Sequence, residues 1–401
     1  MIELFLPLLI GIGFGVAAGL LPGLHPNNTI PIILGLSVIF GPLPTAIILI
    51  TSGVINSFVN FIPSILLGAP EDSTVLGVLP GHRLLMEGRG YEAIKLCVMG
   101  CLGGVLFSIL TLPFFVMFIP YLYNLLRPHI HWLLIFVITY MILTEKGKNI
   151  FFAFAVFMLS GILGLIVLNN FSDSSLFPLL TGLFGLPTLL MSLYQKTKLP
   201  EKFSFEEERI DRKNILYCIS IGGLAGIVAG LLPGIGATQS TILTQQSFRK
   251  NNKDPRSFLM SIGAITVSDI VYSILALWLI QNPRSGIAVG ISKLLEVGFK
   301  EALFFIVFIV ISAGIGAFVT LKITKISLGF LKKVNYSKLC LYTSIFLFIL
   351  TIVFSGLTGI IILIASVAVG LIPNQLNIRR SHAMGCLILP TILFFIGVYV
   401  L

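Results

Sequence analysis

The sequence predicts an all-α polytopic membrane protein that consists of two inverted-topology repeats with broken or re-entrant Pro-Gly helical hairpins. Of its 401 residues, 56% are hydrophobic and 10% are charged, and the mean hydropathy is +1.04. This apolar content exceeds what a water-soluble domain needs to form its core. The apolar residues form two sets of seven segments, and the hexapeptide AGLLPG occurs once in each set. Most Lys and Arg residues lie in alternate connections between the segments, as expected for cytoplasmic loops.

The membrane segments are predicted from length and hydropathy, since a spanning helix needs about 20 apolar residues and a re-entrant one fewer. The first segment has no basic residue before its apolar run, so we expect a permanent membrane element and not a secretory signal. We expect residues 1–194 to form the first repeat, 195–214 a cytoplasmic linker and 215–401 the second repeat. The second segment of each set is short enough to be re-entrant. The expected segments are 3–21, 27–41, 43–68, 93–119, 130–144, 149–169 and 176–194, followed by 215–232, 235–247, 257–281, 301–321, 337–354, 356–373 and 383–401.

The two sets of segments are similar in sequence, which indicates a duplication. The motif AGLLPG begins at Ala18 and again at Ala229, an offset of 211. Pro70 follows the third segment of the first set as Pro283 follows that of the second set, an offset of 213. Repeats of this length are duplicated bundles, because solenoid repeats have periods of about 20 to 50 residues.

An odd number of crossings per repeat would make the second repeat enter the membrane from the opposite side. If the linker is cytoplasmic and every segment crosses, all but four of the 26 Lys and Arg residues lie in or beside cytoplasmic loops. The four exceptions are Arg127, Arg284, Lys293 and Lys300. This distribution favours inverted repeats over a parallel duplication.

Each Leu-Leu-Pro-Gly sequence is expected to end a helix, because Pro lacks the backbone N–H donor and Gly permits the turn. The residues that follow are polar where lipid would require apolar side chains. Irregular backbone at that depth is tolerated only when it is buried in protein or lines a cavity, and helix N-termini there can bind an anion. A tight loop at the membrane surface is the alternative, with His25 a hydrogen-bonded loop residue. The candidate substrate-binding residues in these hairpins are Pro22, Gly23, His25, Asn27, Asn28, Pro233, Gly234, Thr238, Gln239 and Ser240.

The third segments carry polar residues at helical spacing. Ser52, Asn56 and Asn60 recur every four residues and share one helix face. The third segment of the second repeat carries an equivalent polar face. Asp269 in it is an intramembrane carboxylate, which either binds a cation or carries a proton, or else is hydrogen-bonded for helix packing. The candidate ion-coupling residues are Asn56, Asn60, Thr266, Asp269 and Ser273.

The charged residues near the two prolines, the cysteines and the absence of enzyme motifs narrow the candidate functions further. Arg284 could neutralise an anionic substrate or extend to lipid headgroups, whereas Glu71 and Asp72 would repel an anion. The five cysteines lie in or beside apolar segments without metal-ligand neighbours, so we expect them to pack as small hydrophobic residues. The sequence contains no Walker-type loop, no serine-nucleophile elbow and no HExxH motif, so we do not expect an enzyme.

These motifs, taken together, resemble a known family. The stretches AGLLPGLHPNNTIPIILGL, APEDSTVLGVLPGHRLLMEGRGYEAI, FGLPTLL and AGLLPGIGATQSTI are similar to the TctA-like permeases, the large membrane subunits of tripartite tricarboxylate transporters. The resemblance covers most of the chain in the same order. Where the family usually has a Pro-Gly-Thr-like turn after the third segment, this chain has Pro70 followed by Glu71, and the matching Pro283 is followed by Arg284. The residues that match by position are Pro22, Gly23, Ser73, Thr74, Pro233 and Gly234.

The resemblance implies a secondary transporter of the cell membrane for a small organic anion such as a carboxylate, coupled to a Na⁺ or H⁺ gradient. It implies a small membrane subunit and an extracytoplasmic binding protein as partners, besides the anionic substrate and membrane lipids. We expect no nucleic acid and no cofactor, with Na⁺ as a candidate coupling ion. The alternative function is a translocase for a lipid-linked polyprenyl phosphate, which would need a lateral apolar opening and a basic headgroup clamp.

Overall fold

The fold is entirely helical in the part of the chain that the computed structural model describes, without a strand in it. Among these residues, seven helices are long and apolar enough to cross a membrane, and five shorter apolar helices accompany them. The expectation of an all-α polytopic membrane protein is therefore confirmed. The structure describes residues 4–21, 26–68, 72–170, 175–194, 204, 210–231, 236–238, 240–242, 244, 255–281, 283–331, 336–376 and 378–398.

The helices of the first half follow the expected segments closely. Gly41 has a φ of 83° and Pro42 begins the next helix, so the chain breaks between the second and third expected segments. The elements are α1 (Phe5–Leu20), α2 (Pro26–Gly35), α3 (Ser37–Phe40), α4 (Pro42–Val59), α5 (Phe61–Leu66), η2 (Asp72–Gly77), α6 (Val78–Met86), α7 (Gly90–Leu126), η3 (Arg127–His129), α8 (Ile130–Leu143), α9 (Asn149–Asn170), α10 (Leu176–Leu180), the π-helical turn η5 (Thr181–Gly185) and α11 (Leu186–Tyr194).

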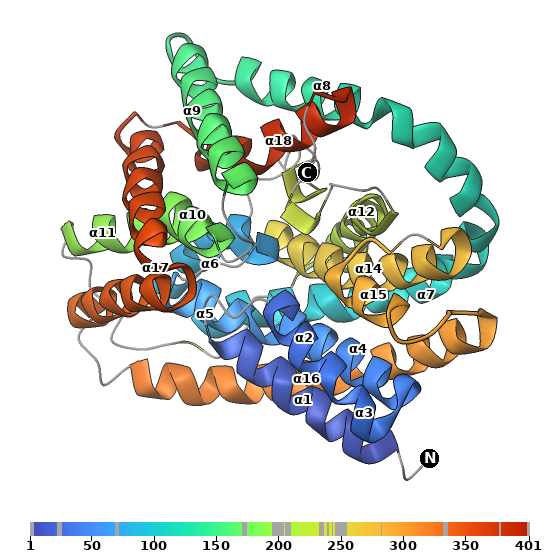
Figure 1. Ribbon diagram of the computed structural model, residues 1–401. Helices are drawn as coiled ribbons and strands as arrows, with labels where there is room; N and C mark the ends of the chain where they lie inside the picture. The colour runs from blue at the N-terminus through green and yellow to red at the C-terminus, as the bar shows by residue number, and fades with distance from the viewer. Residues whose placement is uncertain are drawn as a thin grey trace.

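The second half also follows the expected segments, with one long helix in two arms. Helix α17 is interrupted at Gly356, which has φ 60° and ψ −153° and is the first residue of the expected segment 356–373 (Figure 1). The expected segment 235–247 is described only in part. The elements are α12 (Arg212–Leu231), α14 (Pro255–Ile280), α15 (Gly286–Ser292), α16 (Phe299–Leu331), α17 (Tyr336–Gln375), η6 (Arg380–Met384) and α18 (Gly385–Ile396).

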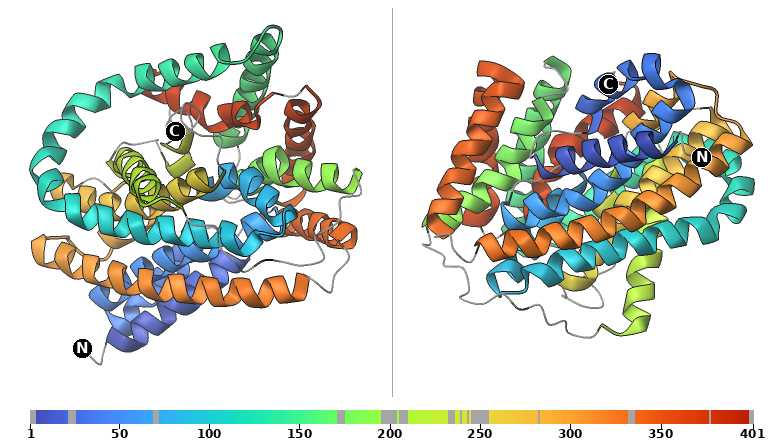
Figure 2. Two further views of the ribbon diagram at one scale, coloured as in Figure 1. Left: turned by 180° about the vertical axis from the view of Figure 1, so that it is seen from behind. Right: turned by 90° about the horizontal axis from the view of Figure 1, so that it is seen from below.

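Two helices extend beyond the apolar runs that predicted them. Helices α7 and α16 lie beside one another as the long rods of Figure 2 and are longer than the expected segments 93–119 and 301–321. The extra turns of α16 carry Lys322 and Lys325, whose ammonium groups lie 5.8 Å from the ring of Phe318 and 5.3 Å from that of Tyr91. The hydropathy of a segment marks the part that suits lipid, whereas the helix continues where charged side chains can reach water.

The same glycine-mediated crossing occurs twice in the fold. Gly11, Gly15 and Gly19 of α1 lie against α4, and a Cβ atom built on Gly11 would lie 2.7 Å from Cβ of Thr51. Gly222, Gly226 and Gly230 of α12 lie against α14 in the same manner. The two glycine sets are related by the offset of 211, and their contact residues on α4 and α14 by the offset of 213, which matches the offsets of the sequence motifs. Small residues at every fourth position allow close backbone approach in membrane helices.

The helices pack around two main apolar cores. The first body comprises α1–α7, α12 and α14–α16, and the second body comprises α8–α11, α17, η6 and α18. The second body occupies the upper and left side of Figure 1. Each body takes helices from both halves of the chain, so a packing unit does not coincide with a sequence repeat. The repeat boundaries and the inverted orientation in the membrane stay predictions.

Candidate functional site

The polar face of α4 lies inside the first body and is joined to η2. Asn56 and Asn60 are 3% and 1% exposed. The amide of Asn60 donates a hydrogen bond to the hydroxyl of Ser73 at 3.4 Å, and the hydroxyls of Ser64 and Thr74 are hydrogen-bonded to each other. The structure therefore brings together an expected coupling residue, Asn60, and the expected substrate-binding pair Ser73 and Thr74.

The polar face of α14 has an equivalent connection to the start of α15. The hydroxyl of Ser273 donates to that of Ser285 at 2.8 Å and accepts from the backbone N–H of Ser285 at 2.9 Å. Ser285 in turn caps α15 by accepting from the N–H of Ala288 at 3.2 Å. At the offset of 213, Asn60 corresponds to Ser273, so both third helices bind the segment after the matching proline through the same position.

Each segment after these prolines packs on the third helix of the other half. Ile287 of α15 occupies the space that a side chain at Gly53 of α4 would need. Gly77 of η2 faces Ile262 of α14, where an added Cβ would make an ordinary contact at 3.4 Å. Thus η2 is hydrogen-bonded to the polar face of α4 and packs on α14, whereas α15 follows a segment that is hydrogen-bonded to α14 and packs on α4. We call η2 and α15 the crossed segments.

Asp269 and Thr266 lie on the same face of α14 as Ser273. Thr266 is 4% exposed and donates its hydroxyl proton to the carbonyl of Ile262 at 2.9 Å, whereas Asp269 is partly exposed. Asp269 lies at the α12 crossing, where a Cβ on Gly230 would lie 2.7 Å from its carbonyl oxygen. The position that matches Asp269 at the offset of 213 is Asn56, so one stripe carries a carboxylate and the other a neutral amide.

The expected hairpin residues are described only in part. Thr238 and Ser240 are 1% and 0% exposed, and the neighbouring Ala237 packs with Ala225 of α12 and Ile265 of α14. Asn27 and Asn28 lie in the first turn of α2, and Arg284, partly buried, directly precedes Ser285. The approach of the two hairpins to each other stays a prediction. Pro22, Gly23, His25, Pro70, Glu71, Pro233, Gly234 and Gln239 lie outside the described residues.

The buried polar atoms of the candidate site include Oδ1 of Asn56 and Oγ of Ser240, for which the described part of the chain supplies no hydrogen-bond partner. A buried polar atom without a partner costs about 1–3 kcal/mol, so such atoms commonly face a ligand, an ion or water. The site also contains Ser285 and Ser64, which the sequence stripes alone did not identify, because their contacts depend on how the post-proline segments fold back.

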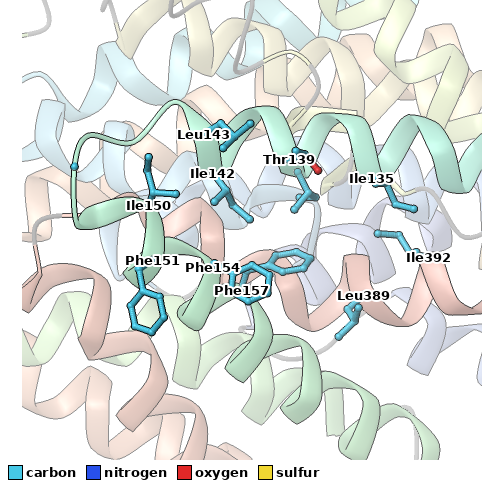
Figure 3. A pocket seen from close by; sticks show the side chains of 12 residues that line it. Ile135, Thr139, Ile142, Leu143, Ile150, Phe151, Phe154, Phe157, Leu389 and Ile392 are labelled. Carbon is cyan, nitrogen blue, oxygen red and sulfur yellow. The ribbon is translucent and has the colours of Figure 1, made fainter.

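An apolar groove of about 780 Å³ lies elsewhere, in the second body between α8, α9 and α18 (Figure 3). Ile138, Phe157 and Leu389 are among the side chains that line it. Among the described residues that line the groove none is charged. It therefore supplies apolar walls but not the basic headgroup clamp that a lipid-linked phosphate would require.

Comparison with known proteins gives one family and one curated relative. The profile described as "Tripartite tricarboxylate transporter TctA family" matches residues 5–385. An uncharacterised protein of Methanocaldococcus jannaschii is 33% identical over 400 residues, which cover 97% of this chain and 98% of the relative. No solved structure matches the chain.

Proposed function

The chain belongs to the tripartite tricarboxylate transporter TctA family, and on this premise we propose that it is the permease of a secondary transport system for a small organic anion such as a carboxylate. Family membership identifies a multi-pass membrane transporter component. The substrate, the coupling ion and the partners are the parts that we add. Because the family is described as tripartite, we propose a small membrane subunit and an extracytoplasmic binding protein as partners.

The observation that carries the proposal is the pair of buried polar faces on α4 and α14. The most apolar stretch of α4 and α5 is entirely buried, and 83% of that of α14 is buried, yet each helix presents amide, hydroxyl or carboxylate groups at its centre. Polar groups inside membrane helices cost free energy and are typical of substrate and ion pathways. The crossed segments η2 and α15 contact both helices, so the two polar faces belong to one region, as expected for a site between two repeats.

We propose that the substrate binds at hydroxyl and amide donors of this region. Asn60, Ser73 and Thr74 supply donors from the first half, and Thr238 and Ser240 from the second. Arg284, next to Ser285, supplies a cation at the other connection. Hydrogen bonds to an ionised carboxylate are about twice as strong as neutral ones, so donors of this kind suffice for selective binding.

Asp269 is the proposed coupling residue. The sequence contains no nucleotide-binding motif, so uphill transport draws on an ion gradient. A carboxylate on the same helix face as the hydroxyl oxygens of Thr266 and Ser273 offers ligands of the kind that hard cations favour, or it exchanges a proton. The lipid-linked phosphate alternative has no comparable support, because the apolar groove lies apart from the polar faces.

Exchange in reconstituted vesicles tests this function. Vesicles that contain the purified permease and unlabelled citrate or succinate are placed in a solution of the same labelled anion, so that exchange requires no ion gradient. We expect labelled anion to enter permease vesicles and not protein-free vesicles. Transfer of a polyprenyl phosphate between leaflets, without exchange of any carboxylate, would contradict the proposal.

A further inference from the structure

Two adjacent arginines at the start of η6, Arg379 and Arg380, have different surroundings. Nε of Arg379 lies 3.2 Å from the carboxylate of Glu145, and its Nη atoms donate to Thr144 at 3.2 and 3.3 Å. Arg380 instead donates from Nε to Oδ1 of Asn374 at 2.5 Å and from Nη1 to Oγ1 of Thr188 at 2.6 Å. Within the described residues, no carboxylate forms an ion pair with Arg380.

These hydrogen bonds to neutral groups leave the charge of Arg380 without a counter-charge and some of its N–H donors unused. A guanidinium carries five N–H donors in a planar fork, and the two hydrogen bonds to neutral groups use two of them. Its side chain is partly buried, where a charge without a counter-charge is costly. The planar fork matches the geometry of a carboxylate, which accepts two parallel hydrogen bonds.

The neighbours of Arg380 add further donors. Oδ1 of Asn374 accepts from Arg380, which fixes the amide so that Nδ2 points away, and Nδ2 is buried without a partner in the part of the chain that is described. Ser381 is 4% exposed, and its hydroxyl has no partner there either. A location rich in N–H and O–H donors and poor in acceptors suits an anion and does not suit a cation.

Arg380 lies near enough to α6 of the first body for its charge to act on His82. Nδ1–H of His82 in α6 donates a hydrogen bond to the carbonyl of Ile65 at 3.2 Å, and the pKa of His82 is lowered mainly by burial and in part by repulsion from Arg380. Helix α6 directly follows η2, which carries Ser73 and Thr74, and Val75 of η2 belongs to the second apolar core. Arg380 is therefore held by the second body at its boundary with the segment that carries Ser73.

We propose that Arg380 anchors an anion subsite, formed with Asn374 and Ser381, that holds a carboxylate of the substrate where the second body meets η2 and α6. The inference rests on the proposed function and adds a second cation, besides Arg284, to a site otherwise built from neutral donors. A substrate with two or more carboxylates spans Arg380 and the hydroxyl donors, whereas a monocarboxylate occupies only one of the two.

The test compares Arg380 with its paired neighbour in the full permease. In the vesicle exchange assay with succinate and citrate, we expect Arg380→Gln to raise the KM at least tenfold, Arg380→Lys to raise it less, and the maximal rate to change little. Arg379→Gln is the matched control: it breaks an ion pair with Glu145, so we expect a lower unfolding temperature and a KM within about twofold of the parent.

A second variant separates anion binding from a structural role. Asn374→Asp retains the shape of the side chain and supplies an internal carboxylate that competes for Arg380. We expect this variant to raise the KM for succinate without a loss of thermal stability, whereas a purely structural Arg380 would leave the KM unchanged. An unchanged KM in Arg380→Gln and Asn374→Asp would overturn this inference alone. A parent chain that neither exchanges nor is stabilised by any carboxylate would overturn it together with the proposed function.

Discussion

The crossing of α1 on α4 makes a quantitative prediction for Gly15. A Cβ atom on Gly15 would lie 2.7 Å from Cβ of Ile55 and 2.7 Å from the carbonyl oxygen of Ser52. Ordinary contacts begin at 3.4 Å, so the two helices would have to separate by about 0.7 Å. One of the obstructing atoms is backbone and cannot rotate away. Overpacking of this kind costs about 1–3 kcal/mol, so we expect Gly15→Ala to lower the free energy of unfolding by that amount.

The same helix supplies a matched control. Gly13 has no atom within 4 Å of an added Cβ, so Gly13→Ala meets no obstruction and improves helix propensity by up to about 1 kcal/mol. Gly226→Ala at the matching crossing of α12 on α14 is expected to destabilise like Gly15→Ala, since its Cβ would meet Ser268 and the carbonyl of Ile265. Unfolding of the purified protein in detergent, followed by intrinsic fluorescence against temperature, measures all three variants. Equal stability of the Gly13 and Gly15 variants would refute the packing argument.

Three further predictions concern function and pH. Asp269→Asn retains the shape of the side chain and removes its charge. We therefore expect exchange of a labelled carboxylate to persist while gradient-driven accumulation is lost. Accumulation equal to that of the parent would make Asp269 a packing residue. Asn60→Ala removes the hydrogen bond to Ser73, worth about 1 kcal/mol, and should raise the exchange KM about fivefold. Ser292→Ala, at an exposed position, is the control and should leave the KM unchanged. Equal KM values for the two variants would refute the role of Asn60. The pKa of His82 is lowered from its ordinary value of 6.5, so the folded state binds fewer protons than the unfolded state and loses stability as the pH falls below 6.5. The unfolding temperature of His82→Gln should therefore fall less between pH 7 and pH 5 than that of the parent. Parallel curves of unfolding temperature against pH would contradict this prediction.

Much of the fold follows from local sequence patterns. The break at Gly41 and Pro42 and the interruption at Gly356 coincide with boundaries that hydropathy predicts, because Gly and Pro act on the chain within one or two residues. The duplicated glycine crossings share the offsets of the duplicated motifs, because the same pair of helices occurs in both halves of the chain. Helix ends were less predictable: α16 continues past its apolar run, since helix formation does not require lipid contact.

The candidate site was predictable as separate parts and not as an arrangement. The stripe of Asn56 and Asn60 is visible from helical spacing, whereas the contact of Asn60 with Ser73 depends on the return of η2 after the proline. The division into two bodies depends on packing between segments that are more than 100 residues apart. The charge pattern indicates only that Arg380 lies in a cytoplasmic loop, because nothing in the local sequence distinguishes it from Arg379, whose partner Glu145 lies far away in the chain.

Substrate protection of a single cysteine tests the central claim most directly, that a small carboxylate binds where the crossed segments join α4 and α14. Ser73 is partly exposed and the native cysteines are buried, so a thiol reagent should label the Ser73→Cys variant above a low background. Leu143→Cys, at an exposed position in the groove of Figure 3, is the matched control. We predict that citrate or succinate slows labelling at position 73 and leaves labelling at position 143 unchanged. Protection at position 143 and none at position 73 would contradict the account.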